Sequence, residues 1–218
     1  MRTVLKQRLL KILGCSTGER KVHQFSKQNA DIVFWAFSRM GGHQRYVISQ
    51  FRFGSSYAAD FVVLFSYSGA WEVHFIELEP PGDNVITRSG RPTKRLNSAI
   101  SQIGDWKDFV EQNRAFLRKE LSDWCQKKAL SGLDLSRSSP HGLIAGSTAY
   151  EMSVDFEYHI VIGRRESVTN EKRRKMQQLQ HEGRICTYDG FVDIAHNLDR
   201  VALNTGESVS VSERQQDF

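Results

Sequence analysis

The stretch DFVVLFSYSGAWEVHFIELEP, residues 60–80 of a chain of 218 residues, decides the fold. Two dense apolar runs, residues 60–65 and 71–79, flank a short segment that contains Ser and Gly, and two prolines follow. Apolar runs of this length on either side of a turn are typical of two strands joined in a hairpin. We therefore predict an antiparallel β-hairpin that ends at Pro80.

The register of this hairpin determines where its acidic side chains lie. If residues 67–70 form a symmetric turn, Ser66 pairs with Trp71, and Asp60 then lies opposite Glu77. Because side chains alternate between the two faces of a strand, Glu79 shares the face of Glu77. The pattern predicts three carboxylates on one face at the strand ends, and a shift of one residue would separate them.

A cluster of like charges across a sheet is destabilising, so the predicted carboxylates need an explanation. A divalent cation could bind between them, or nearby Lys or Arg side chains could neutralise them. One carboxyl group could instead be protonated, with a raised pKa, or the groups could simply be solvated at an exposed sheet end. The hairpin residues alone leave these four interpretations open.

Helical and strand patterns alternate along the rest of the chain. Apolar spacing predicts helices over residues 19–29, 92–119, 169–181 and 191–198, strands over 47–53, 158–163 and 184–188, and a loop over 130–140. Antiparallel strands followed by alternating helices and strands predict an α/β fold, with a mixed central sheet flanked by helices.

Charge is distributed unevenly along the chain. Residues 1–54 contain 10 Lys or Arg and 2 Asp or Glu, whereas residues 55–218 contain 20 and 23. A basic N-terminal quarter on a near-neutral body is typical of a protein with a polyanion partner. We divide the chain into a basic amphipathic helix (1–16), one domain (17–200) and a disordered tail (201–218).

The cysteines and the hydropathy pattern bear on the compartment. Cys15, Cys125 and Cys186 are far apart and form no Cys-x-x-Cys pair, which favours a reducing, cytoplasmic location and disfavours a structural zinc site. No stretch approaches the roughly 18 apolar residues that a membrane span needs, so we expect no contact with a membrane.

Motifs around the hairpin resemble the C-terminal nuclease domain of the Shedu anti-phage defence family, within the PD-(D/E)xK nuclease superfamily. They are IELEPP at 76–81, T-x-x-G-x-P at 87–92 and L-x-x-A-x-x-Q-I-x-D-W at 96–106, with weaker likeness in IVIGR at 160–164 and TYDGF at 187–191. The resemblance covers about residues 19–198. It implies a restriction-endonuclease-like fold, metal-dependent DNA endonuclease activity in antiviral defence, and assembly into a homo-oligomer.

The resemblance also implies a metal site. Asp60 and Glu77 would hold Mg²⁺ or Mn²⁺, with Glu19 as an acidic residue supplied by the first helix. The metal would activate a water for attack on a phosphodiester. Gln102, one helical turn before Trp106, would reach the metal or the phosphate.

One position departs from the general superfamily pattern. Glu79 stands where that pattern has a Lys that orients the nucleophile, although Glu-x-Glu looks normal for the Shedu-like branch. Glu79 could bind a second metal or shape the site, and Lys94 could supply the missing cation from the next helix. Both are therefore candidate catalytic residues.

Basic residues near the motifs are candidate contacts to DNA phosphates, without sequence readout. They are Arg88, Arg91, Arg95, Arg164 and Arg165. The alternative is a catalytically inactive nuclease fold that binds nucleic acid or a partner protein, which the missing Lys favours. A binder of signal nucleotides is a third hypothesis.

Overall fold

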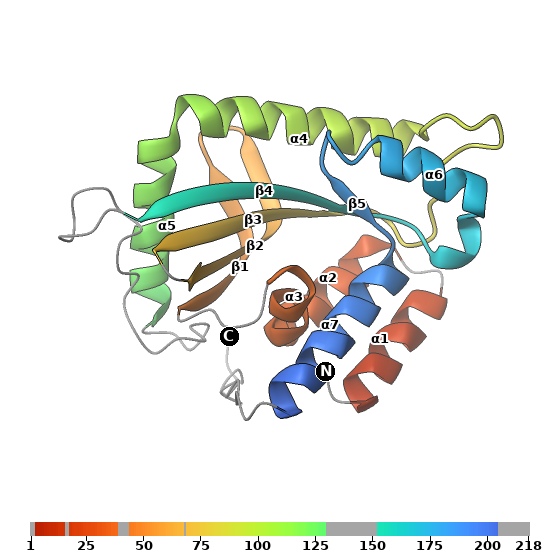
Figure 1. Cartoon of the computed structure of the whole chain (residues 1–218), viewed down its shortest axis with the longest axis horizontal. Coiled ribbons are helices and arrows are strands. Elements are labelled where there is room, and N and C mark those ends of the chain that lie inside the picture. Colours follow the sequence, from red (N-terminus) through yellow and green to blue (C-terminus); the bar gives the residue numbers. More distant parts are fainter. Residues whose placement is uncertain (1–2, 16–17, 39–43, 68, 130–151, 205–218) are drawn as a thin grey trace.

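A computed structural model of the chain describes residues 3–15, 18–38, 44–67, 69–129 and 152–204 (Figure 1). A five-stranded sheet forms its centre, in the order β1-β2-β3-β4-β5. The first three strands are antiparallel, and β3, β4 and β5 are parallel, so the sheet is mixed. The strands are β1 (Arg45–Phe53), β2 (Tyr57–Tyr67), β3 (Ala70–Leu78), β4 (Ser153–Val161) and β5 (Arg184–Cys186).

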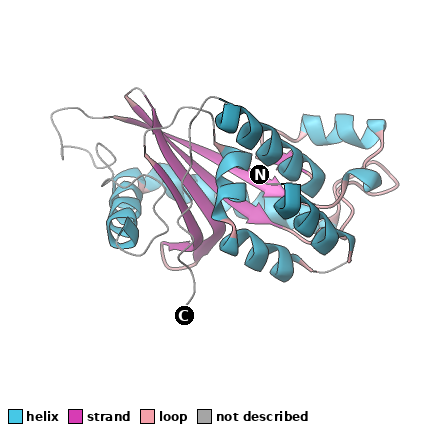
Figure 2. Cartoon of the chain, turned by 90° about the horizontal axis from the view of Figure 1, so that it is seen from below, coloured by secondary structure: helices cyan, strands magenta, loops and turns pink. Residues whose placement is uncertain are grey.

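Helices cover both faces of the sheet. One face packs against α4 (Lys94–Gln112) and α5 (Arg114–Ala129), which follow β3 and lead back to β4. The other packs against α1 (Thr3–Gly14), α2 (Glu19–Gln28), α3 (Ala30–Phe37) and α7 (Tyr188–Asn204), the layer that lies over the strands in Figure 2. The short helix η1 (Arg165–Ser167) and α6 (Asn170–Gln178) connect β4 to β5. The predicted α/β, restriction-endonuclease-like fold is confirmed.

The predicted hairpin register is confirmed. Ser66 pairs with Trp71, and the ladder continues to Phe61 and Ile76. Tyr67 also pairs with Ala70, so the connection between the strands is shorter than four residues. Gly69 follows with φ +86°, a backbone conformation that costs glycine little.

Two helical regions differ from the sequence-based prediction. The helix expected over 92–119 is two helices. α4 ends at Gln112, and the next residue, Asn113, caps it with a side-chain hydrogen bond to the Phe109 carbonyl. The helix α3 was missed: six of its eight residues are buried, so its sequence has no polar face to mark a helical period.

β4 begins five residues before its predicted start. Asp155 and Glu157 interrupt its apolar character, because the first part of this strand is not covered on both faces. The predicted loop at 130–140 and nearly all of the predicted tail lie outside the described residues.

The N-terminal helix belongs to the same core as the sheet. Leu9 and Leu13 of α1 are buried with residues of α3 and α7, and Lys6 lies 3.4 Å from Asp193 of α7. The helix α1 therefore packs into the same core as the helices that follow it. The predicted domain limits stay a prediction. None of the described helices is long and apolar enough to cross a membrane.

We expect Gly163→Ala to destabilise the fold. Gly163 has φ +66°, and a Cβ there would lie 2.5 Å from the Asp83 carbonyl oxygen. The unfavourable backbone conformation and the close contact should together lower the free energy of unfolding by about 2 kcal/mol, measured by urea denaturation. Gly82→Ala is the matched control, since a Cβ at Gly82 meets no atom within 4 Å. Equal stability of the two variants would contradict this account.

Candidate functional site

Acidic side chains from both strands of the hairpin meet at one end of the sheet. Phe61 pairs with Ile76, so the preceding residue Asp60 lies beside Glu77. Glu77 shares the face of Phe75, which packs against α4. Glu79 follows two residues later, just beyond the end of β3, and its main-chain N–H donates to the Val161 carbonyl of β4.

The Asp60 carboxylate has one oxygen fixed by the main chain. Its Oδ2 accepts a hydrogen bond of 2.8 Å from the Leu78 N–H, across the hairpin. Burial raises the pKa of Asp60, and the hydrogen bond from Leu78 and the nearby His23 oppose that rise. The other oxygen, Oδ1, lies 3.7 Å from Nε2 of His23.

Glu77 is the most strongly perturbed carboxyl group of the site. Burial raises its pKa to about 8, and the charges of Asp60, Glu79 and Glu19 add to the rise. A hydrogen bond from the Gln102 side chain works in the opposite direction. Gln102 of α4 therefore reaches back to the acidic cluster.

Glu79 is buried, with 5% of its surface exposed, and its charge is balanced from α4. Nε of Arg95 lies 3.2 Å from Oε2 of Glu79 and 3.6 Å from Oδ2 of Asp83. Burial raises the pKa of Glu79 to about 7 against the opposing effect of Arg95. The cation beside Glu79 is thus Arg95, whereas Lys94 is exposed, and its catalytic role stays a prediction.

The first turns of α2 complete the cluster from the opposite helical layer. Burial and the charge of Asp60 raise the pKa of Glu19, which also interacts with Arg95 and Asp83. His23, one turn further along α2, was missed by the sequence analysis. Its spacing of four residues from Glu19 was the available signal, because residues four apart share a helix face.

Of the five predicted DNA contacts, Arg95 pairs with Glu79, and the other four fall into two groups. Arg164 donates two hydrogen bonds to Asp189, of 3.0 and 2.9 Å, and Arg165 lies 2.6 Å from Asp193. These bonds raise the pKa of both guanidinium groups. Both side chains hold η1 to α7, so their contact with nucleic acid would have to compete with these ion pairs.

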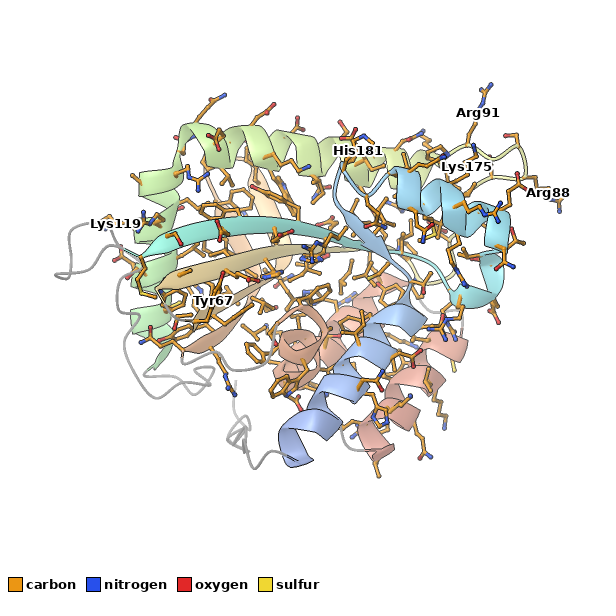
Figure 3. All side chains as sticks on the ribbon, viewed as in Figure 1. Tyr67, Arg88, Arg91, Lys119, Lys175 and His181 are labelled. Carbon is orange, nitrogen blue, oxygen red and sulfur yellow. The ribbon has the colours of Figure 1, made fainter. Side chains whose placement is uncertain are left out.

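Arg88 and Arg91, in contrast, are exposed and form no ion pair with another described residue. They project from a tight loop that is closed by hydrogen bonds between Thr87 and Arg91, and Gly90 allows the turn with φ +78°. Figure 3 places them at the same end of the molecule as Lys175 of α6. The loop leads directly from the strand of Glu77 to the helix of Arg95.

The acidic cluster, as the described residues form it, has the ligand chemistry of a magnesium site but not a ready-made ligand geometry. Among the residues that the structure describes, no group of three or more His, Cys, Asp or Glu side chains is arranged to hold a metal ion. Each carboxylate instead faces a protein partner: Leu78 N–H for Asp60, Gln102 for Glu77 and Arg95 for Glu79. The donor set of hard carboxylate oxygens still fits Mg²⁺, which uses one or two carboxylates and retains waters.

A groove of about 640 Å³ lies elsewhere, along β4, α4 and the start of α5. It contains Tyr67, Lys107 and Arg114 among its lining residues and none of the clustered carboxylates. Figure 3 shows Tyr67 far from Arg88 and Arg91. The groove is therefore separate from the acidic cluster.

Comparison with known families identifies the family of the chain. The family described as Shedu protein SduA, C-terminal, matches residues 16–192, most of the chain. The chain belongs to this Shedu family. Membership supports a role in anti-phage defence. A search of curated proteins found no match. The match begins three residues before Glu19 and ends at Val192, so all the clustered carboxylates lie within it.

We expect Glu77→Gln to stabilise the protein in EDTA, by an amount that grows from about pH 5 to 8. The folded pKa of about 8 exceeds the ordinary value of 4.5. As pH rises through this window, the unfolded state loses the proton first, so wild-type stability falls by up to about 1.4 kcal/mol per pH unit. Glutamine removes this dependence and keeps the contact with Gln102.

Urea unfolding at pH 5, 6, 7 and 8 measures this difference. Glu111→Gln is the control, because the Glu111 side chain is 76% exposed on the far part of α4 and lies outside the cluster. A difference between Glu77→Gln and wild type that does not change with pH would contradict the electrostatic account of the site.

Proposed function

We propose that the chain is a metal-dependent DNA endonuclease that acts in anti-phage defence. The observation that carries the proposal is the convergence of Asp60, Glu77, Glu79 and Glu19 at one sheet end, with Gln102 bonded to the cluster. Four carboxyl groups with raised pKa in one place are costly to a fold, and such groups concentrate at functional sites. Membership of the Shedu family supports the same conclusion.

Asp60 and Glu77 would hold the metal, Mg²⁺ or Mn²⁺. When bound, the metal supplies charge to polarise a phosphodiester and lowers the pKa of a water. The Leu78 N–H holds the Asp60 carboxylate in place, which leaves Oδ1 available. Gln102 orients Glu77 and is close enough to the cluster to position a phosphate oxygen.

Arg95 takes the place of the superfamily lysine in this proposal. Its guanidinium lies between Glu79 and Asp83, on the helix that also carries Gln102. A fixed cation here offsets the negative charge that develops on the phosphate in the transition state. Glu79 orients that cation, and Lys94, on the same turn of α4, adds positive potential at the rim.

Contacts with the DNA backbone would come from the Arg88–Arg91 loop at the same end of the molecule. The loop is held by its own hydrogen bonds, so its two arginines are presented to phosphates with little ordering cost. Assembly into a homo-oligomer belongs to the same proposal.

The second candidate function is an inactive nuclease fold that binds nucleic acid or a protein. The ion pair between Arg95 and Glu79 favours it, because a carboxylate stands at the position where the superfamily lysine would act. This candidate predicts DNA binding in EDTA without cleavage under any metal.

We expect Asp60→Asn to abolish cleavage of duplex DNA while leaving the fold intact. The amide removes a charged ligand, and a loss of more than about 100-fold in rate is expected. The assay uses linear, plasmid and single-stranded DNA with Mg²⁺ or Mn²⁺, beside an EDTA lane. Asp108→Asn, on the exposed side of α4 and outside the quoted motifs, is the matched control. Wild-type rates in Asp60→Asn would overturn the assignment.

We expect the double substitution Arg88→Ser and Arg91→Ser to weaken DNA binding and its salt dependence. Each lost phosphate contact should reduce the slope of log affinity against log salt by about 0.9. Fluorescence anisotropy with a labelled duplex in EDTA measures the slope without cleavage. Lys119→Ser is the control, because this exposed side chain lies at the opposite end of the molecule (Figure 3). An equal slope change in the control would remove the loop from the interface.

A further inference from the structure

His23 of α2 packs against the acidic cluster. Its ring stacks on Phe61 of β2, with centroids 4.8 Å apart and an angle of 30° between the planes. The side chain is 14% exposed. Phe61 follows Asp60 directly, so the stacking fixes the imidazole beside the carboxylate.

The Nε2 atom of His23 is enclosed and has no hydrogen-bond partner among the described residues. Asp60 Oδ1 is 3.7 Å away, beyond the 2.7–3.2 Å of a hydrogen bond from nitrogen to oxygen. Buried polar atoms are nearly always paired, and an unpaired one requires an explanation such as a bound water or ion. Oδ2 of Asp60 accepts the hydrogen bond from the Leu78 N–H, and its other oxygen, Oδ1, faces Nε2 of His23, so that both atoms could bind one metal ion.

The separation of these two atoms is close to that of two ligands on one cation. Ligands about 2.1 Å from a metal, at angles between octahedral and tetrahedral values, are about 3.0–3.4 Å apart. The observed 3.7 Å needs a shift of a few tenths of an ångström. Glu19, one turn before His23, adds a carboxylate on the same side.

We propose that Nε2 of His23 is a ligand of the divalent cation held by Asp60 and Glu77. The inference rests on the metal site of the proposed function and names its cation class. Mg²⁺ selects oxygen ligands, whereas imidazole nitrogen favours first-row transition ions. The site therefore prefers Mn²⁺ or Co²⁺ to Mg²⁺.

The test uses the whole chain of 218 residues, stripped of metal and titrated with Mn²⁺ and with Mg²⁺ in a calorimeter. Pulsed electron paramagnetic resonance of the Mn²⁺ complex then reports directly bound nitrogen. We expect Mn²⁺ to bind at least about tenfold more tightly than Mg²⁺ and to show a nitrogen coupling.

Two variants separate ligation from packing. His23→Phe keeps a ring on Phe61 and removes the donor atom, so it should lose the nitrogen coupling and most of the preference for Mn²⁺. His23→Gln replaces nitrogen with an amide oxygen and should narrow the ratio of the two affinities. His181→Gln is the control, because the His181 side chain is 70% exposed and pairs with Glu182 (Figure 3). Thermal unfolding without metal verifies that each variant folds.

The outcomes distinguish this inference from the proposed function. Mn²⁺ binding that disappears in Asp60→Asn but shows no nitrogen coupling would overturn the role of His23 and leave the metal site standing. The same holds if His23→Phe keeps the wild-type ratio of affinities. Absence of any metal binding to the wild-type chain would overturn both.

Discussion

The antiparallel register of β2 and β3 is the constraint on which the site depends. A shift of one residue would move Asp60 away from Glu77 and to the other face of the sheet. Apolar patterning specifies this register only weakly, because Phe61 and Val62, neighbours that face opposite sides, are both buried. The short connection through Gly69, with its positive φ, therefore has to fix the pairing of the strands.

Without a bound cation, the clustered carboxyl groups destabilise the fold. Neutral hydrogen-bond donors and one arginine offset part of this destabilisation. Burial raises the pKa of all four carboxyl groups, and each of Asp60, Glu77 and Glu79 has a different partner. Among the partners that the structure describes for these three carboxylates, only Arg95 brings a full positive charge. A structural ion-pair network would balance its carboxylates more completely, as Arg164 and Arg165 do with Asp189 and Asp193. The excess of carboxyl groups at the sheet end supports the proposed cation site.

Much of the fold and part of the site could be predicted from the sequence, for identifiable reasons. The hairpin and the helix carrying Gln102 have strong apolar patterns, and the turn residues around Gly69 indicate the register of the hairpin. The helix α3 could not be found, since a helix buried on all sides has no period. Arg95 and Lys94 are adjacent in sequence, and only the rotation of α4 about its axis decides which of them reaches Glu79. His23 was missed because its neighbour Phe61 is distant in sequence.

The site draws on both helical layers, and this changes the meaning of the N-terminal region. Gln102 and Arg95 come from α4 on one face, while Glu19 and His23 come from α2 at the edge of the other. The position of α2 depends in turn on its packing within the layer formed by α1, α2, α3 and α7. That layer contains α1, whose Leu9 and Leu13 are buried in it, and α7, which ion pairs with Arg164 and Arg165 hold to η1. The basic N-terminal segment is therefore part of the framework of the candidate site.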